Sequence, residues 1–283
     1  MIIFMKNLVA LLLLSALLSS CSGLQNRHDT ALAIASGGGL TPQVLDTGQF
    51  RLTLFYRGLA QHSSTIAIYI EGDGHAWKQK HVLSDDPTPI DPVALKLAAT
   101  DPSPAALYIA RPCQYLKDED PQACGSRYWS SHRFAEEVIR SVNKAVDWGV
   151  RKSGAAKVYI YGYSGGGAVA ALVTAMRTDV AGLTTIAAPL DHAYWTRLQG
   201  ISPLSASLNP ADATDHLQYI PQVHFAGSED KVVPVSILES YQERFKDRTN
   251  ITLRVIPGFD HHCCWADAWP GLLLQAGPNA AAR

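Results

Sequence analysis

Short apolar runs and amphipathic stretches alternate along most of the chain. Residues 65–70, 105–110 and 183–187 are largely apolar, as expected for strands that are buried on both faces of a parallel sheet. Residues 92–99 and 134–150 instead carry apolar side chains at helical spacing. This alternation of strand and helix predicts right-handed crossover connections and an α/β fold with a mostly parallel sheet.

The two ends of this region add further strands. Residues 31–34 and 50–56 alternate at strand spacing and predict an antiparallel opening pair. Residues 222–226 and 251–256 predict the last two strands, with a helix that starts at Pro234 between them. The whole pattern therefore predicts a central sheet of about eight strands, flanked by helices.

Residues 189–219 break this rhythm of strand and helix. The stretch has no long helical period, and Trp195 and several leucines are scattered through it. It fits a short cap insertion between the sixth and seventh strands of the sheet. Because insertions of this kind border a binding pocket, we expect residues 189–219 to carry substrate selectivity.

A serine surrounded by glycines follows the run of β-branched and aromatic residues at 158–163. Gly162 and Gly166 flank Ser164 with the spacing G-x-S-x-G, and a small apolar run suited to a helix continues to Met176. Bare Cα atoms at the two glycines allow strand and helix to approach, while the serine sits in a strained turn with its hydroxyl exposed. The stretch predicts a nucleophile elbow rather than a simple turn. It lacks the Lys-Ser/Thr pair of a phosphate-binding loop.

Two more polar residues follow predicted strands. Asp230 lies in G-x-x-D-x-x-V-P and His261 lies in G-x-x-H, so the chain order is Ser164, Asp230, His261. In this order and spacing, the chain from roughly residue 44 to 277 resembles the α/β-hydrolase superfamily of serine hydrolases. The resemblance implies the α/β-hydrolase fold for this region, with 189–219 as its cap insertion.

The chemistry of such a triad explains why these residue types are needed. A serine hydroxyl is a poor nucleophile until an imidazole takes its proton, and a carboxylate on the other ring nitrogen fixes the imidazole tautomer. The resemblance implies that Ser164 attacks, His261 acts as base and then acid, and Asp230 orients His261. The expected reaction is cleavage of a carboxylic ester, thioester or related acyl bond in a small-molecule or lipid substrate, without metal or cofactor. The alternative is a non-catalytic surface lipoprotein that uses the same fold to bind a ligand or partner.

Neighbouring residues compete for two of the three roles. His262 is adjacent to His261, but the G-x-x-H spacing favours His261. Glu229 and Asp191 are alternative acids, of which Asp191 follows the sixth strand, where some relatives carry the acid. The run D-H-H-C-C at 260–264 lacks the ligand spacing of a zinc site, so no metal is expected there.

Backbone donors and substrate contacts are predicted around the elbow. The turn after the strand at 65–70 contains Gly72, Asp73 and Gly74, and the resemblance implies that the N–H of Asp73 or Gly74 joins that of Gly165 in an oxyanion hole. Two residues near the strand ends are candidate substrate contacts. They are Tyr163, and Arg111, which would hold an anionic substrate group or else pair with a structural acid.

The N-terminal residues predict export. Lys6 precedes an apolar run at 8–18 that is too short for a membrane span, and small residues precede Cys21. This resembles a bacterial lipoprotein signal peptide at 1–20, with Cys21 as the lipidated (palmitate-carrying) first mature residue; an ordinary secretory signal is the alternative. Ser22 after the cysteine implies sorting to the outer membrane, where the protein would face the periplasm or the cell surface.

Length, composition and charge limit the number of domains and the kinds of partner. A chain of 283 residues with 47% hydrophobic residues suits one hydrolase domain at 44–277, after a tether with a first strand at 21–43 and before a disordered tail at 278–283. The formal net charge of -1 provides no basic field for nucleic acid.

Four cysteines remain besides Cys21, an even number that favours disulfides in an exported protein. We expect Cys113 to pair with Cys124 across a short polar loop. A bond from Cys263 or Cys264 to that loop is the alternative.

Overall fold

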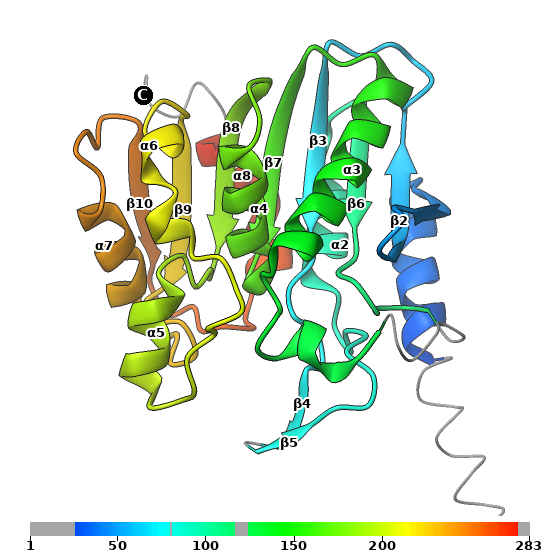
Figure 1. Ribbon diagram of the computed structural model, residues 1–283. Coiled ribbons are helices and arrows are strands. Elements are labelled where there is room, and N and C mark those ends of the chain that lie inside the picture. Colours follow the sequence, from blue (N-terminus) through cyan, green and yellow to red (C-terminus); the bar gives the residue numbers. More distant parts are fainter. Residues whose placement is uncertain (1–25, 80, 117–123, 277–283) are drawn as a thin grey trace, which may run out of the picture.

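The computed structural model describes residues 26–79, 81–116 and 124–276, and its centre is one eight-stranded sheet (Figure 1). The signal peptide and Cys21 lie outside these residues. In spatial order the strands are β1 (Thr41–Asp46), β2 (Arg51–Arg57), β6 (Ala106–Ile109), β3 (Thr65–Ile70), β7 (Lys157–Tyr163), β8 (Val180–Ile186), β9 (Gln222–Gly227) and β10 (Ile251–Ile256). Strands β3 and β6 to β10 are parallel, whereas β1 and β2 are antiparallel to their neighbours. The predicted sheet of about eight strands is confirmed.

Helices cover both faces of the sheet and enclose two apolar clusters. One cluster lies between the sheet and the helices α3, α4 and α7; the other lies beneath α2, α8 and a helix at residues 26–37. The helices are α2 (Val93–Thr100), α3 (Glu136–Ser153), α4 (Gly165–Ala175), α5 (His192–Gln199), α6 (Thr214–Leu217), α7 (Val235–Glu243) and α8 (Trp265–Ala276), with short 3₁₀ turns η1 (Ser126–Trp129) and η2 (Pro210–Asp212). Because β3 and β6 to β10 are parallel, their carboxyl ends lie together at one edge of the sheet.

The first predicted strand is wrong, because residues 31–34 belong to the helix at 26–37. Ala31 and Ala35 are both buried against the sheet, and this spacing of four residues is that of a helix. The antiparallel partner of β2 is instead β1, whose register pairs Thr41 with Tyr56. A four-residue window is too short to separate alternation from one turn of a helix.

A two-stranded hairpin that the sequence pattern did not predict projects from the carboxyl edge of the sheet (Figure 1). It consists of β4 (Trp77–Gln79) and β5 (Val82–Leu83), and it belongs to the segment 75–91 that joins β3 to α2. Residues 189–219 lie between β8 and β9 as expected and fold as α5, η2 and α6. Within the described ranges, no helix is long and apolar enough to cross a membrane.

The expected disulfide between Cys113 and Cys124 is present, with Cα atoms 5.5 Å apart. The alternative pairing is wrong, because Cys263 is bonded to its neighbour Cys264. The bond joins Cys113, which follows β6, to Cys124, which precedes η1.

Candidate active site

Ser164 occupies the turn between β7 and α4 in a strained conformation, with φ 50° and ψ -127°. A Cβ placed on Gly162 would overlap the backbone of Gly166, so strand and helix approach more closely than any side chain would allow. A Cβ on Gly165 would overlap the carboxylate of Asp73, which fixes how closely the turn after β3 approaches the start of α4. Gly162 and Gly165 are therefore required by close contact, whereas the strained conformation belongs to Ser164 itself.

Two residues from distant loops complete a hydrogen-bonded chain with this serine. His261 Nε2 lies 3.0 Å from Ser164 Oγ, and His261 Nδ1 lies 2.8 Å from Asp230 Oδ2. Asp230 follows β9 and His261 follows β10, so both loops open at the same edge of the sheet as the serine turn. The structure brings together all three residues that the sequence singled out.

The acid and the imidazole are each held by further hydrogen bonds. Asp230 Oδ1 accepts from the N–H groups of Val232 and Val233, both at 2.8 Å, which leaves Oδ2 for the imidazole. The hydroxyl of Tyr163 donates to the carbonyl of His261 at 2.8 Å and thus fixes the loop that carries the ring. These contacts give both side chains one orientation before any substrate binds.

The competing residues occupy other positions. His262 is exposed, and Glu229 is exposed with its backbone N–H bonded to Phe259. Asp191 is fully buried as the N-cap of α5, where it accepts from Tyr194 N and Ser240 Oγ. None of the three has a hydrogen bond to Ser164 or His261 among the described contacts.

The turn after β3 is fixed beside the start of α4. Glu71 accepts from Gly72 N at 2.9 Å, and Gln114 Nε2 donates to the carbonyl of Gly72 at 3.0 Å. Within the described part of the chain, the N–H groups of Asp73, Gly74 and Gly165 have no protein acceptor. These three groups are the expected oxyanion donors, and they remain free to bind a ligand.

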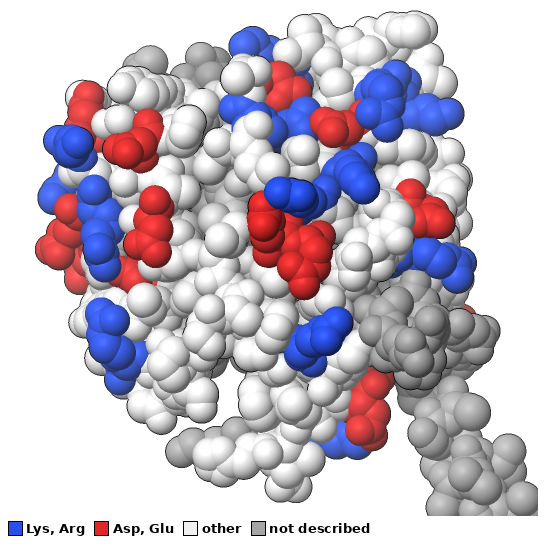
Figure 2. All heavy atoms as spheres, in the orientation of Figure 1, with Lys and Arg blue, Asp and Glu red and all other residues white. Residues whose placement is uncertain are grey.

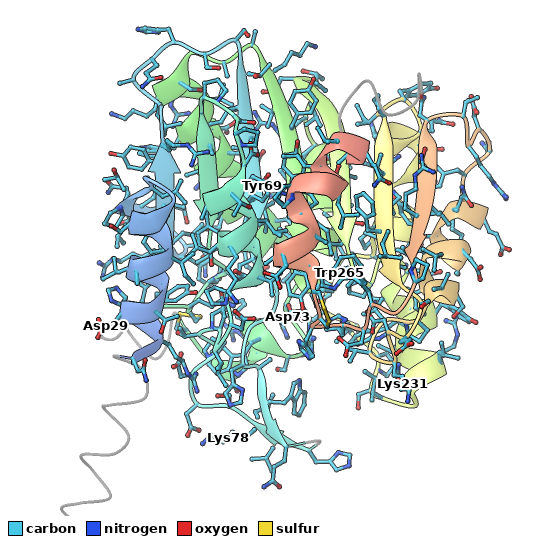
Figure 3. The ribbon with its side chains drawn as sticks, turned by 180° about the vertical axis from the view of Figure 1, so that it is seen from behind. Asp29, Tyr69, Asp73, Lys78, Lys231 and Trp265 are labelled. Atoms are coloured by element: carbon cyan, nitrogen blue, oxygen red, sulfur yellow. A yellow bond between two sulfur atoms is a disulfide. The ribbon has the colours of Figure 1, made fainter. Side chains whose placement is uncertain are left out.

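Of the two roles expected for Arg111, the structure shows the pairing with a structural acid. The Arg111 guanidinium lies 3.0 Å from Asp73 Oδ1, the residue is only 3% exposed, and it is not among the described residues that line the space beside Ser164. Arg133 binds the other carboxylate oxygen of Asp73 at 2.7 Å. Burial alone would raise the pKa of Asp73, but Arg133 and Arg111 outweigh burial and lower it. Asp73, which is labelled in Figure 3, is therefore a fixed anion between two cations.

Glu71 is a second buried acid at this position. Burial raises its pKa to about 7, although the N–H groups of Gly72, Ala94 and Leu95 oppose the rise. Two of these donors belong to the first turn of α2, so Glu71 links the turn after β3 to that helix. The folded state therefore favours the protonated form of the Glu71 carboxyl below neutral pH.

We expect Glu71 to make stability depend on pH in a defined direction. Because its folded pKa is raised from 4.5 to about 7, its contribution is complete below pH 4.5 and is lost as pH rises through 7. Relative to Glu71→Gln, the free energy of unfolding of the unmodified protein should fall by about 3 kcal/mol across this range. Urea unfolding of both proteins at several pH values measures the difference. If the free energy of unfolding changed with pH by the same amount in both proteins, the raised pKa of Glu71 would be contradicted.

A cavity of about 240 Å³ opens beside the serine. Tyr163 lines it as expected for a substrate contact, together with Ser164 and His261, and residues 71–75 and 89–91 form the opposite wall. Among the described residues that line it, none comes from 189–219. The expectation that the cap insertion borders the pocket is wrong, because His75 and residues 89–91, between β3 and α2, line it instead.

Three side chains that shape the site had no assigned role in the sequence. Arg133 and Gln114 act on the turn after β3 from loops that are remote in sequence, and no spacing or periodicity points to them. Glu71 directly follows an apolar strand, and a charged residue at the end of a buried strand was the sequence signal that could have identified it. Within the described ranges, no cluster of three or more His, Cys, Asp or Glu side chains is arranged to hold a metal ion.

No protein-family model and no curated protein sequence matches the chain. Among solved structures, Est1E from Butyrivibrio proteoclasticus is similar with a TM-score of 0.56 and 15% identity, over 83% of this chain and 98% of that chain. An esterase from Pyrococcus furiosus gives a TM-score of 0.57 at 12% identity, over 84% and 90% of the two chains. An α/β serine hydrolase without lid from Xanthomonas campestris gives 0.52 at 14% identity, over 84% and 95%. The chain therefore has the α/β-hydrolase fold.

Proposed function

We propose that the protein is a serine hydrolase that cleaves a carboxylic ester, thioester or related acyl bond through an acyl-enzyme. The observation that carries this proposal is the hydrogen-bonded chain from Ser164 through His261 to Asp230 at the wall of a cavity. The similar solved structures include an esterase and a serine hydrolase, which supports the same reaction class. Fold alone does not carry the activity, since one fold hosts many functions.

The first half of the reaction forms the acyl-enzyme. His261 Nε2 takes the proton of Ser164 Oγ while the oxygen attacks the acyl carbonyl carbon, and Asp230 stabilises the imidazolium. The N–H of Gly165, with that of Asp73 or Gly74, binds the negative oxygen of the tetrahedral intermediate. The bond to the leaving group then breaks, and His261 gives the proton to the departing oxygen, sulfur or nitrogen.

The second half regenerates the serine. Water enters where the leaving group departed, His261 takes one of its protons, and the hydroxide attacks the acyl carbon. Collapse of the second intermediate breaks the bond to Ser164 Oγ, which recovers its proton from His261, and releases the carboxylic acid. No electron transfer is needed in either half.

We also propose that the protein is exported and anchored by a lipid on Cys21. The support is the signal-like sequence before Cys21 and the disulfide between Cys113 and Cys124, which belongs in an oxidising compartment. Incorporation of labelled palmitate that is lost in Cys21→Ala would agree with this anchor. A mature protein without label would contradict it.

The experiment that tests the hydrolase proposal is a rapid-mixing assay with p-nitrophenyl butyrate. If deacylation is the slower half, p-nitrophenol should appear in a burst that approaches one equivalent of enzyme and is followed by steady turnover. Parallel assays with thioester and anilide substrates identify the preferred bond. A protein that hydrolyses none of them and shows no burst would favour the binding alternative.

A further inference from the structure

Segment 75–91, whose two ends line the cavity, exposes large apolar side chains. Trp77 is 42% exposed and Val82 is 48% exposed on the β4–β5 hairpin, and Ile90, which lines the cavity, is 60% exposed. Figure 2 shows a largely uncharged surface at this end of the molecule, with a recess beside the projecting hairpin. Scattered exposed apolar residues are normal, but a cluster around a cavity mouth indicates an interaction surface.

A second apolar group lies on the other side of the same end. Leu198 and Ile201, at the end of α5, are 48% and 42% exposed, and Val232, two residues after Asp230, is 44% exposed. Gln199 Nε2 donates to the carbonyl of Val232, so α5 and the loop after β9 are directly joined. Figure 3 shows Lys231, beside Val232, and Lys78, beside Trp77, at the same end of the molecule as Asp73. We call these six residues the apolar rim: Trp77, Val82, Ile90, Leu198, Ile201 and Val232.

The start of the described chain lies at this end as well. Arg27 Nη1 donates to the carbonyl of Thr88 at 3.1 Å and pairs with Asp86 at 3.3 Å, which ties the first turn of the N-terminal helix to segment 75–91. Cys21 precedes Arg27 by only six residues, and six residues span at most about 20 Å. A lipid on Cys21 would therefore hold the cavity mouth close to the membrane surface.

The size of the cavity also indicates that the cavity mouth lies at a membrane surface. Its volume of about 240 Å³ lies below the range of about 300–1,000 Å³ that holds a drug-sized ligand. A long acyl chain bound through its carbonyl would extend beyond the cavity, past Ile90. The exposed part of such a chain would then need an apolar medium outside the protein.

From these observations we propose that the apolar rim docks on a phospholipid bilayer and that the substrates are acyl esters of membrane lipids. This inference rests on the proposed hydrolase function and on the anchor at Cys21. Trp77 and Val82 enter the interface between headgroups and acyl chains, where an aromatic ring and an aliphatic side chain both gain from burial. The cavity then receives the ester from the bilayer, while the distal part of its chain stays in lipid.

Docking is tested directly by the fluorescence of Trp77, the only one of the six tryptophans that is among the exposed large apolar residues. The full-length lipidated protein is reconstituted into phosphatidylcholine vesicles that contain brominated phospholipid. We expect tryptophan emission to be quenched in the unmodified protein and to be quenched much less in Trp77→Phe. Equal quenching in the two proteins would overturn docking by the hairpin. Because this measurement needs no activity, it remains informative if the hydrolase proposal fails.

The substrate class is tested by a pair of double variants. Trp77→Ser/Val82→Ser removes two residues that do not line the cavity, and Met176→Ser/Tyr219→Ser is the control. Met176 directly follows α4 and Tyr219 precedes β9, so both lie at the opposite edge of the sheet, and they are 53% and 74% exposed. We expect the hairpin variant to hydrolyse vesicle phospholipid about tenfold more slowly than the control, with unchanged turnover of soluble p-nitrophenyl butyrate.

Each other outcome has a defined meaning. Equal phospholipid hydrolysis in the two double variants would overturn the docking proposal. Soluble ester turnover without any phospholipid turnover would overturn the substrate class but leave the hydrolase proposal intact. Absence of both activities in all proteins, with Trp77 still quenched, would overturn the hydrolase proposal and the substrate class but leave bilayer docking intact. A detergent-solubilised dimer that dissociates in Trp77→Ser/Val82→Ser would assign the rim to a second copy of the chain instead.

Discussion

We expect His261→Ala to lower kcat for p-nitrophenyl butyrate by a factor on the order of 10⁵. The imidazole lies 3.0 Å from Ser164 Oγ and 2.8 Å from Asp230, so its removal takes away both the base of the first half-reaction and the acid that protonates the leaving group. The residual rate would come from the backbone donors and from binding. Steady-state kinetics on purified protein, with circular dichroism to verify folding, provide the measurement.

The adjacent histidine gives the matched control. His262 also lines the cavity but has no hydrogen bond to Ser164 or Asp230 among the described contacts, so His262→Ala should cost less than about tenfold in kcat. The double variant Ser164→Ala/His261→Ala should be no slower than either single variant, because residues that act as one unit lose their effect together. Losses that multiply in the double variant, or a greater loss from His262→Ala, would contradict the assignment.

The second large effect is expected from Asp73→Asn. The substitution preserves the size of the side chain but leaves Arg111 and Arg133, which are 3% and 6% exposed, without their shared anion. Breaking a buried ion pair from one side costs about 3–5 kcal/mol, so the free energy of unfolding should fall by that amount. Urea unfolding at constant pH measures the loss.

The same substitution should also reduce activity. The carboxylate of Asp73 abuts Gly165 Cα, so its two arginines help to hold both sides of the expected oxyanion hole together. Loss of one well-placed donor costs about 3 kcal/mol of barrier, and we expect kcat of the folded protein to fall by up to about 100-fold with a smaller change in KM.

A surface ion pair supplies the control for Asp73. Asp85 pairs with Lys78 on the hairpin and is 88% exposed, so Asp85→Asn should cost no more than about 1 kcal/mol of stability. Stability losses of similar size in Asp73→Asn and Asp85→Asn would show that the ion pairs of Asp73 with Arg111 and Arg133 stabilise the fold no more than a surface ion pair does.

The sequence predicted those parts of the molecule whose signals are local. Ser164 was predictable because the glycines of an elbow are adjacent to the serine, and their need follows from the contact between strand and helix. Asp230 and His261 were predictable because each directly follows a strand, and parallel strands end at one edge. The fold followed from the same alternation of strand and helix.

The remaining features depend on contacts between segments far apart in the chain. Arg133 lies 60 residues from Asp73, and nothing near Arg133 in the sequence indicates an acid there. The position of Arg111 was predicted, but the choice between a substrate anion and Asp73 depended on burial, which one sequence does not reveal. Residues 189–219 were expected to border the cavity, but residues 71–75 and 89–91, on either side of the hairpin in sequence, line it instead.

The central claim is that Ser164 is an activated nucleophile, and covalent labelling tests it most directly. The protein is incubated with a fluorophosphonate probe, digested with trypsin and examined by mass spectrometry. Cleavage after Lys157 and Arg177 yields a peptide in which Ser164 is the only serine. We predict one probe adduct on Ser164 that is lost in Ser164→Ala and greatly slowed in His261→Ala. An unlabelled Ser164 in correctly folded protein, or equal labelling in His261→Ala, would contradict the account.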